Sequence, residues 1–206
     1  ANAAFPYRTA QAITMGSIPT LALRVTYVGE LGWELYCPSE YGAALWDVLW
    51  DAGTAHELRA AGYRAIDALR VEKGYRVWSS DITPEDNPYE AGLGFAVALD
   101  HPTPFLGQEA LRAVKAAGIT RRLRGVRPQD PLAVPLGSEP VRVDGEIVGR
   151  VTSGNYGYRV GRAPAFAYGP ADRAGVGRAV EGGTVGGWPA AGSRPGADGA
   201  PRGDRV

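Results

Sequence analysis

The spacing of apolar residues changes near Gly118, and this change constrains the fold more than any other feature of the chain. Before it, apolar residues recur at the three- and four-residue intervals of an amphipathic helix. Residues 41–52 show this spacing, and helices are expected at 63–73 and 108–117, because a glycine follows each of them. Shorter stretches rich in β-branched and aromatic residues predict strands at 21–28, 33–37 and 91–99.

Residues after Gly118 have the pattern of short strands separated by turns. The segments expected to form strands are 123–126, 141–143 and 147–152. Asp144-Gly145 lies between two of them, and this dipeptide favours a tight hairpin because both positions tolerate positive φ. A series of short strands joined by turns predicts a small barrel or sandwich. The sequence therefore predicts an α+β protein with an α+β portion at residues 1–117 and a small, truncated β-barrel domain at 118–174.

The last part of the chain, residues 175–206, loses this pattern. It contains ten glycines and few β-branched or aromatic residues. Such a composition buries too little apolar surface to offset the entropy of ordering. We expect a disordered tail, and its glycine, alanine, arginine and proline content suggests translation of GC-rich coding DNA out of frame.

Composition excludes several classes of partner. Lys and Arg number 22, as do Asp and Glu, so the formal net charge is zero and no long-range field favours nucleic acid. No apolar run approaches the about 20 residues of a membrane-spanning helix. A single cysteine, Cys37, rules out a disulfide within the chain. The sequence therefore predicts a cytoplasmic protein that binds neither nucleic acid nor membrane. It shows no metal-ligand spacing and no dinucleotide- or phosphate-binding glycine motif.

Two segments place one carboxylate and one guanidinium at ordered positions. Residues 27–34 (YVGELGWE) are expected to form a strand, a turn and a second strand, with Glu30 in the turn. Residues 67–74 (DALRVEKG) are expected to end a helix and to carry Arg70. Together the two side chains are suited to hold a planar ligand. The alternative is a structural one, in which Arg70 pairs with Asp67 three residues earlier on the helix.

These segments resemble the folate-binding domain of the glycine-cleavage T-protein (aminomethyltransferase) family. Three further motifs occur in the order of the family: DITP at 81–84, EAGLG at 90–94 and VTSG at 151–154. The resemblance covers about residues 5–170, and its details are most similar to the C-terminal region of sarcosine and dimethylglycine dehydrogenases. It implies a partial folate-binding aminomethyltransferase domain followed by the small β-barrel.

The resemblance implies specific roles for three residues. Glu30 would accept hydrogen bonds from the aminopyrimidine edge of a pterin, Arg70 would hold the central portion of the folate, and Tyr27 would place its ring beside the ligand or in the core. The cofactor implied is tetrahydrofolate, and FAD is expected only on an N-terminal domain that precedes this chain. No residue of the chain is assigned a catalytic role.

The function implied is one-carbon transfer in a flavin-dependent N-methyl amine dehydrogenase. Its small-molecule partners would be folate and an N-methyl amine, or the imine formed by the flavin domain. Two alternatives remain: a part of a stand-alone glycine-cleavage aminomethyltransferase, and a non-catalytic remnant that acts as an interaction module. Glu34, Asp81 and Glu90 are expected to fix turns and loops, and Trp46 and Trp50 to pack against another element rather than form a substrate cage.

Overall fold

The structure, a computed structural model, describes residues 3–128, 130, 133–143, 145–172, 179–180 and 185–187. Its contacts group the chain into two compact units, Ala1–Tyr75 and Arg76–Val206. Both helices and strands occur, which confirms the α+β class. The two units are described one after the other.

The first unit contains a three-stranded antiparallel sheet in the order β1-β2-β3. Strands β1 (Ala10–Met15) and β2 (Ile18–Leu23) form a hairpin in which Met15 pairs with Ile18. Gly16 takes a φ of 64° in the turn, a value that favours glycine. Strand β3 (Glu34–Tyr36) pairs with the other edge of β2. The sequence analysis did not predict β1, whose residues carry little β-branched or aromatic character.

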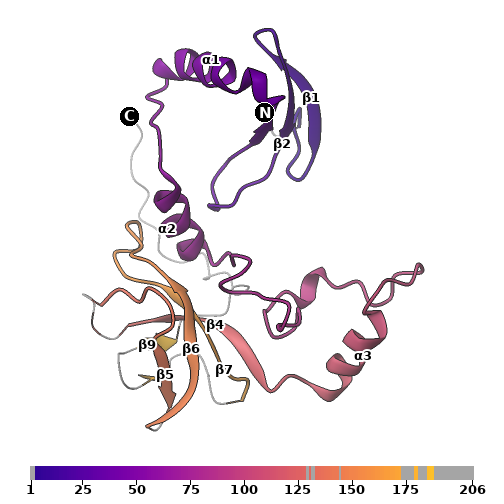
Figure 1. Cartoon of the computed structure of the whole chain (residues 1–206), viewed down its shortest axis with the longest axis vertical. Coiled ribbons are helices and arrows are strands. Elements are labelled where there is room, and N and C mark those ends of the chain that lie inside the picture. The colour runs from indigo at the N-terminus through magenta and orange to yellow at the C-terminus, as the bar shows by residue number, and fades with distance from the viewer. Residues whose placement is uncertain are drawn as a thin grey trace. The chain divides into compact units, whose positions relative to one another are not determined.

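Helix α1 (Gly42–Thr54) lies beside this sheet, as Figure 1 shows. A 3-10 turn at Ser39–Tyr41 precedes it. A Cβ on Gly16 would lie 3.5 Å from Val48 Cγ2, so the β1–β2 turn packs against this helix. Trp46 and Trp50 stack on each other with ring centroids 5.8 Å apart, and both remain exposed. The prediction that these tryptophans pack against another element was therefore wrong: they pack on each other.

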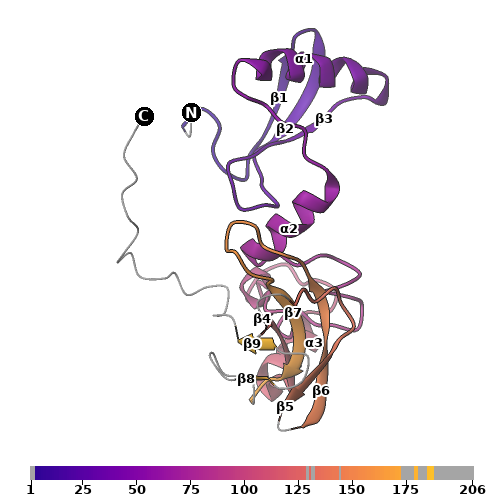
Figure 2. The same cartoon turned by 90° about the vertical axis from the view of Figure 1, so that its left-hand side faces the viewer.

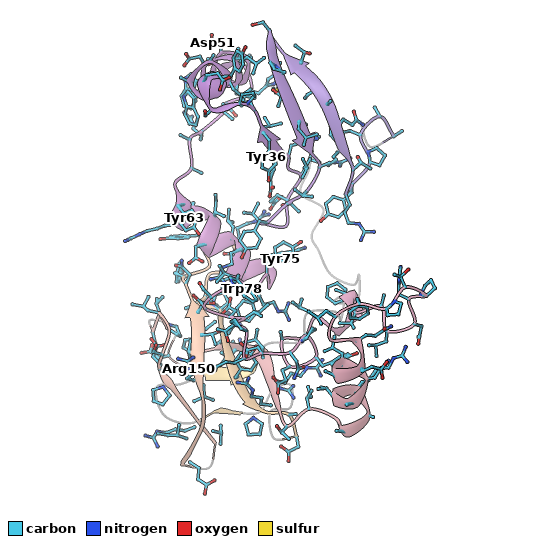
Figure 3. All side chains as sticks on the ribbon, turned by 45° about the vertical axis from the view of Figure 1, so that its right-hand side comes forward. Tyr36, Asp51, Tyr63, Tyr75, Trp78 and Arg150 are labelled. Carbon is cyan, nitrogen blue, oxygen red and sulfur yellow. The ribbon has the colours of Figure 1, made fainter. Side chains whose placement is uncertain are left out.

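Helix α2 (Tyr63–Lys73) ends as its sequence predicted. Gly74 takes a φ of 88°, and its N–H donates to the last carbonyls of the helix. This left-handed residue is the usual C-terminal stop, because glycine meets no Cβ clash there. Figure 3 shows Tyr63 at the beginning of α2 and Tyr75 just beyond its end.

The predicted strand over residues 21–28 is too long. Strand β2 ends at Leu23, and residues 24–33 form an irregular loop before β3 begins at Glu34. The reason is the pairing partner: Ala10 is the first residue of β1 and lies opposite Leu23. Arg24 still exchanges backbone hydrogen bonds with Thr9 and Arg8. The pairing stops there, because Arg8 has a positive φ of 64°, and Val28 N–H bonds instead to Thr26 Oγ1 at 3.2 Å.

The second unit begins with turns rather than with the predicted strand at 91–99. Gly92 takes a φ of 70°, and residues Gly94–Ala96 form the 3-10 turn η2. A Cβ on Gly94 would lie 2.8 Å from the ring of Tyr89, so the chain folds tightly over that ring. Positive φ and such close packing are incompatible with a regular strand, and the strand prediction was wrong. Helix α3 (Gln108–Ala117) follows with the predicted bounds.

A six-stranded antiparallel sheet completes the second unit, in the order β5-β6-β7-β4-β9-β8. The strands are β4 (Arg121–Arg127), β5 (Pro140–Val143), β6 (Glu146–Gly154), β7 (Ala165–Pro170), β8 (Ala179–Val180) and β9 (Val185–Gly187). Figure 2 shows this sheet curling, and the end strands β5 and β8 lie near each other. The sheet is open but barrel-like, as the sequence predicted. Its core contains Val126, Val141, Val151, Ala165 and Ala167.

Two sequence predictions fall partly outside the described residues. In the predicted hairpin turn, Asp144 is not described, whereas its neighbour Gly145 has the expected positive φ of 80°. The tail at 175–206, which was expected to be disordered, lies mostly outside the described residues, but five of its residues form β8 and β9. The two compact units divide the chain between Tyr75 and Arg76. The domain boundary expected between residues 117 and 118 is a different kind of division, and it stays a prediction.

Candidate functional site

The loop after β2 contacts the end of α2 at two points. The ring of Tyr27 stacks on the ring of Tyr75, with centroids 6.0 Å apart and an interplanar angle of 13°. A Cβ on Gly29 would lie 2.3 Å from Lys73 Cδ, so the stem of Lys73 occupies the space above this glycine. Gly29 also has a φ of 75°, which disfavours any other residue. The two segments singled out in the sequence therefore meet in the first unit.

Glu30 lies in this loop and is exposed. It directly follows Gly29, whose place against Lys73 fixes the backbone on its N-terminal side. The structure thus places the carboxylate on a loop held against the end of α2, rather than in the turn between two strands that the sequence predicted.

Arg70 is almost fully buried, with 2% of its surface exposed. Its Nε donates to Asp67 Oδ1 at 2.8 Å, and a terminal nitrogen of the guanidinium lies 2.7 Å from the same oxygen. A further nitrogen donates to the carbonyl of Tyr75 at 3.2 Å. The pairing with Asp67 that the sequence offered as the alternative is therefore present. It holds the guanidinium plane in one orientation.

Tyr27 is 38% exposed and lies outside the core. The partner ring of Tyr75 is less exposed, and burial, with a smaller contribution from Tyr7, raises the pKa of the Tyr75 phenol. Sequence reasoning missed Tyr75. Its place directly after the helix-ending Gly74 was the available signal.

Asp81 forms the centre of a separate cluster in the second unit, where it is fully buried. Its Oδ1 accepts hydrogen bonds from Thr152 Oγ1 and Ser153 Oγ at 2.5 and 2.6 Å, and its Oδ2 accepts one from Val77 N–H at 3.0 Å. Tyr168 OH donates to the Asp81 carbonyl. The DITP and VTSG motifs are therefore joined by side chains, and the predicted structural role of Asp81 is confirmed.

Glu90 and Glu34 also fix local structure. Glu90 Oε2 lies 3.4 Å from both the Asn87 amide nitrogen and Arg121, and its carbonyl accepts from Leu123 N–H. Glu34 Oε2 accepts from Tyr36 OH at 2.6 Å. Neither residue contributes to the contact between the loop and α2.

Comparison with protein families identifies both parts of the chain. Residues 1–101 match the GCVT N-terminal domain, and residues 121–191 match the glycine cleavage T-protein C-terminal barrel domain. The chain belongs to the glycine cleavage T-protein family. The family resemblance inferred from the motifs is confirmed, and the predicted boundary near Gly118 falls between the two matched ranges.

Individual members of the T-protein family differ in length from this chain. Sarcosine dehydrogenase, mitochondrial, of Homo sapiens is 41% identical over 167 residues, which are 81% of this chain and 18% of the relative. Aminomethyltransferase of Symbiobacterium thermophilum is 41% identical over 177 residues, 85% of this chain and 47% of the relative. The chain thus spans less than a fifth of the one and about half of the other.

A solved T-protein structure has the same fold. The glycine cleavage system aminomethyltransferase T from Bartonella henselae superposes with a TM-score of 0.73 at 28% identity. The match covers 81% of this chain and 46% of that protein. The chain is thus an aminomethyltransferase-type domain related to sarcosine dehydrogenase.

Within the described ranges, no group of three or more His, Cys, Asp or Glu side chains is arranged to hold a metal ion. Over the same part of the chain, no helix has the length and apolar character needed to cross a membrane.

Proposed function

We propose that this domain binds tetrahydrofolate and serves as the one-carbon acceptor part of a flavin-dependent N-methyl amine dehydrogenase. The observation that carries the proposal is the contact between the Glu30 loop and the end of α2, made by Tyr27 on Tyr75 and by Gly29 on Lys73. This contact lies in the segments whose sequence resembles the folate-binding motifs of the family.

Glu30 supplies the group best suited to a pterin. An exposed carboxylate on an ordered loop accepts two parallel N–H donors from an aminopyrimidine edge, and such charge-assisted bidentate contacts are strong and directional. Tyr27 offers a partly exposed ring beside it.

Arg70 takes a more restricted role in this proposal. Its guanidinium is almost fully buried and bonded to Asp67 and to the Tyr75 carbonyl. These bonds hold it in a fixed orientation, so a carbonyl or carboxylate of the folate would meet a preorganised donor only at the 3% of the side chain that stays exposed.

The chemistry assigned to the domain needs no nucleophile of its own. An iminium, CH2=NR2⁺, formed from the N-methyl amine by a flavin domain, reacts with the two N–H groups of tetrahydrofolate. Two C–N bonds would form to the methylene carbon, both parts of the original C=N bond would break, and the amine would leave as R2NH2⁺ with the two protons released from the N–H groups. The domain contributes by holding the acceptor near the labile iminium and away from water. FAD belongs to a separate flavin-binding domain in this proposal.

A stand-alone aminomethyltransferase is the second candidate. The identity to the Symbiobacterium thermophilum aminomethyltransferase equals that to the human sarcosine dehydrogenase, and the chain covers a larger share of the former. The coding sequence that surrounds this segment decides between them. A flavin-binding domain in frame upstream supports the dehydrogenase, and a short upstream segment without one supports the stand-alone enzyme. The non-catalytic interaction module is the outcome if the chain does not bind tetrahydrofolate. The predicted cytoplasmic location and the predicted lack of nucleic-acid and membrane partners remain predictions.

The test of folate binding is calorimetric titration of the full chain with tetrahydrofolate. Glu30→Gln keeps the size of the side chain and removes its charge. Loss of a charged bidentate contact costs about 1.5–3 kcal/mol, so the dissociation constant is expected to rise about 10- to 150-fold. Glu40→Gln, on an exposed residue of the same unit, is the control and should bind as the parent does. Equal affinity of Glu30→Gln and the parent would refute the role of Glu30.

A further inference from the structure

The loop that carries Glu30 is closed at its base by contacts between its two ends. The guanidinium carbon of Arg24, just after β2, lies 5.5 Å from the ring centroid of Trp33, just before β3. One residue further in, a Cβ on Gly32 would lie 3.2 Å from the carbonyl oxygen of Val25. The backbone therefore approaches itself closely there, and a larger residue would have to push the Val25 carbonyl aside.

Arg24 is anchored independently of the loop. It is 8% exposed. Its backbone N–H donates to the carbonyl of Thr9, and its carbonyl accepts from Arg8 N–H, both at 2.9 Å. Its guanidinium donates to the carbonyl of Phe5. These bonds attach Arg24 to the segment that leads into β1.

Trp33 is held on two sides. The Arg24 guanidinium lies over its ring, and the ring of Phe5 meets it edge-on, with centroids 6.1 Å apart and an interplanar angle of 77°. Trp33 nevertheless keeps 44% of its surface exposed. Its contacts therefore act less through burial than through the attraction between a partly desolvated cation and an aromatic face.

We propose that Arg24 and Trp33 are positioning residues that hold the Glu30 loop in its ligand-binding conformation; the proposal rests on the folate-binding function above. We call the Arg24–Trp33 contact the loop clasp. A loop whose ends are joined has fewer conformations to lose when a ligand orders it. The clasp closes the base of the loop, and the contacts of Tyr27 and Gly29 with α2 hold its tip. Glu30 lies between these two attachments.

The first test compares tetrahydrofolate affinities. Trp33→Leu removes the aromatic face and keeps an apolar side chain, whereas Trp33→Phe keeps a ring. Trp33→Leu should weaken tetrahydrofolate binding about 3- to 30-fold relative to the parent, from the range of cation–π energies. Trp33→Phe should bind nearly as tightly as the parent. Trp46→Leu, at another exposed tryptophan of the same unit, should bind as the parent does. In a double-variant cycle with Arg24→Met, the two losses should be clearly less than additive.

The second test is cleavage of the loop, which needs no ligand. A glutamate-specific protease cuts after Glu30 only when the loop leaves its folded conformation. Trp33→Leu should speed this cut at least about threefold, with the cut after Glu40 unchanged as an internal reference.

An unchanged rate of cleavage after Glu30 in Trp33→Leu overturns the clasp, and so does unchanged folate affinity with normal folding. If the parent chain itself does not bind tetrahydrofolate, the proposed function fails, and the cleavage result alone decides whether the clasp holds the loop.

Discussion

Replacement of Asp81 by alanine should destabilise the second unit strongly. The carboxylate is fully buried and accepts three hydrogen bonds, from Thr152, Ser153 and the Val77 amide. Removing the shared acceptor leaves buried hydroxyl and amide donors unsatisfied at about 1–3 kcal/mol each, so the loss should be about 3–5 kcal/mol. We expect a loss in this range rather than the sum of three bonds, since Thr152 Oγ1 has a second acceptor in the carbonyl of Phe166 at 3.4 Å.

The conservative change Asp81→Asn should cost less than alanine. An amide keeps an acceptor oxygen for the Thr152 and Ser153 hydroxyls, but it sets an NH2 group against the Val77 N–H. One unsatisfied donor costs about 1–3 kcal/mol. The order parent, Asp81→Asn, Asp81→Ala in decreasing stability therefore follows from the geometry of the two carboxylate oxygens.

Native-state hydrogen exchange is the suitable assay, because it reports each unit separately and a single unfolding free energy is not defined for a chain with two units. The opening free energy of amides in β6 should fall in Asp81→Ala, and that of amides in the β1–β2 hairpin should not change. Asp100→Ala, at an exposed residue of the same unit, is the control. A loss below about 1 kcal/mol in Asp81→Ala, or an equal loss in the control, would contradict the reasoning.

Two further changes test the barrel-like sheet. Gly149→Ala places a Cβ 1.9 Å from the carbonyl oxygen of Tyr168, in backbone that cannot withdraw without breaking the β6–β7 pairing; the second unit should lose about 2 kcal/mol or more. Gly169→Ala meets no atom within 4 Å and should be nearly neutral by the same hydrogen-exchange measurement. Burial, followed by the nearby Asp86 carboxylate, raises the pKa of the Tyr168 phenol well above its ordinary 10.0. A raised pKa in the folded state means that this stabilisation is complete below pH 10 and is lost as pH rises above it. Between about pH 9 and pH 11 the opening free energy of the second unit should therefore fall less in Tyr168→Phe than in the parent. If the two proteins lose stability equally over this range, the pKa of Tyr168 does not differ between the folded and unfolded states.

Helix ends were the part of the fold most readily predicted from the sequence. Helices α2 and α3 have the predicted bounds, because Gly74 and Gly118 are local stop signals that need no tertiary partner. Strand ends are harder to predict, because a strand extends only over residues that have a hydrogen-bonded partner on a neighbouring strand. Residues 24–28 have strand character but lie beyond the end of β1, and residues 91–99 are diverted by the positive φ of Gly92.

The candidate site was predicted in part. The sequence motifs indicated that the Glu30 loop and the end of α2 belong together, and the structure brings the two segments into contact through Tyr27 and Gly29. The attachments at Tyr75 and at Trp33 could not be predicted, because each depends on how an irregular loop turns back on itself. Local propensity carries little information about such a path.

The Asp81 cluster has a consequence for how the protein is divided for expression. The match to the N-terminal family domain ends at residue 101, which suggests a cut between residues 101 and 121. Such a cut would leave the Asp81 carboxylate on one recombinant piece and the Thr152 and Ser153 hydroxyls on the other. The compact unit begins instead at Arg76. A barrel fragment designed from the family boundary should therefore express as an incomplete, aggregation-prone protein, whereas one that starts at Arg76 keeps the buried Asp81 carboxylate together with the Val77, Thr152 and Ser153 groups that donate to it.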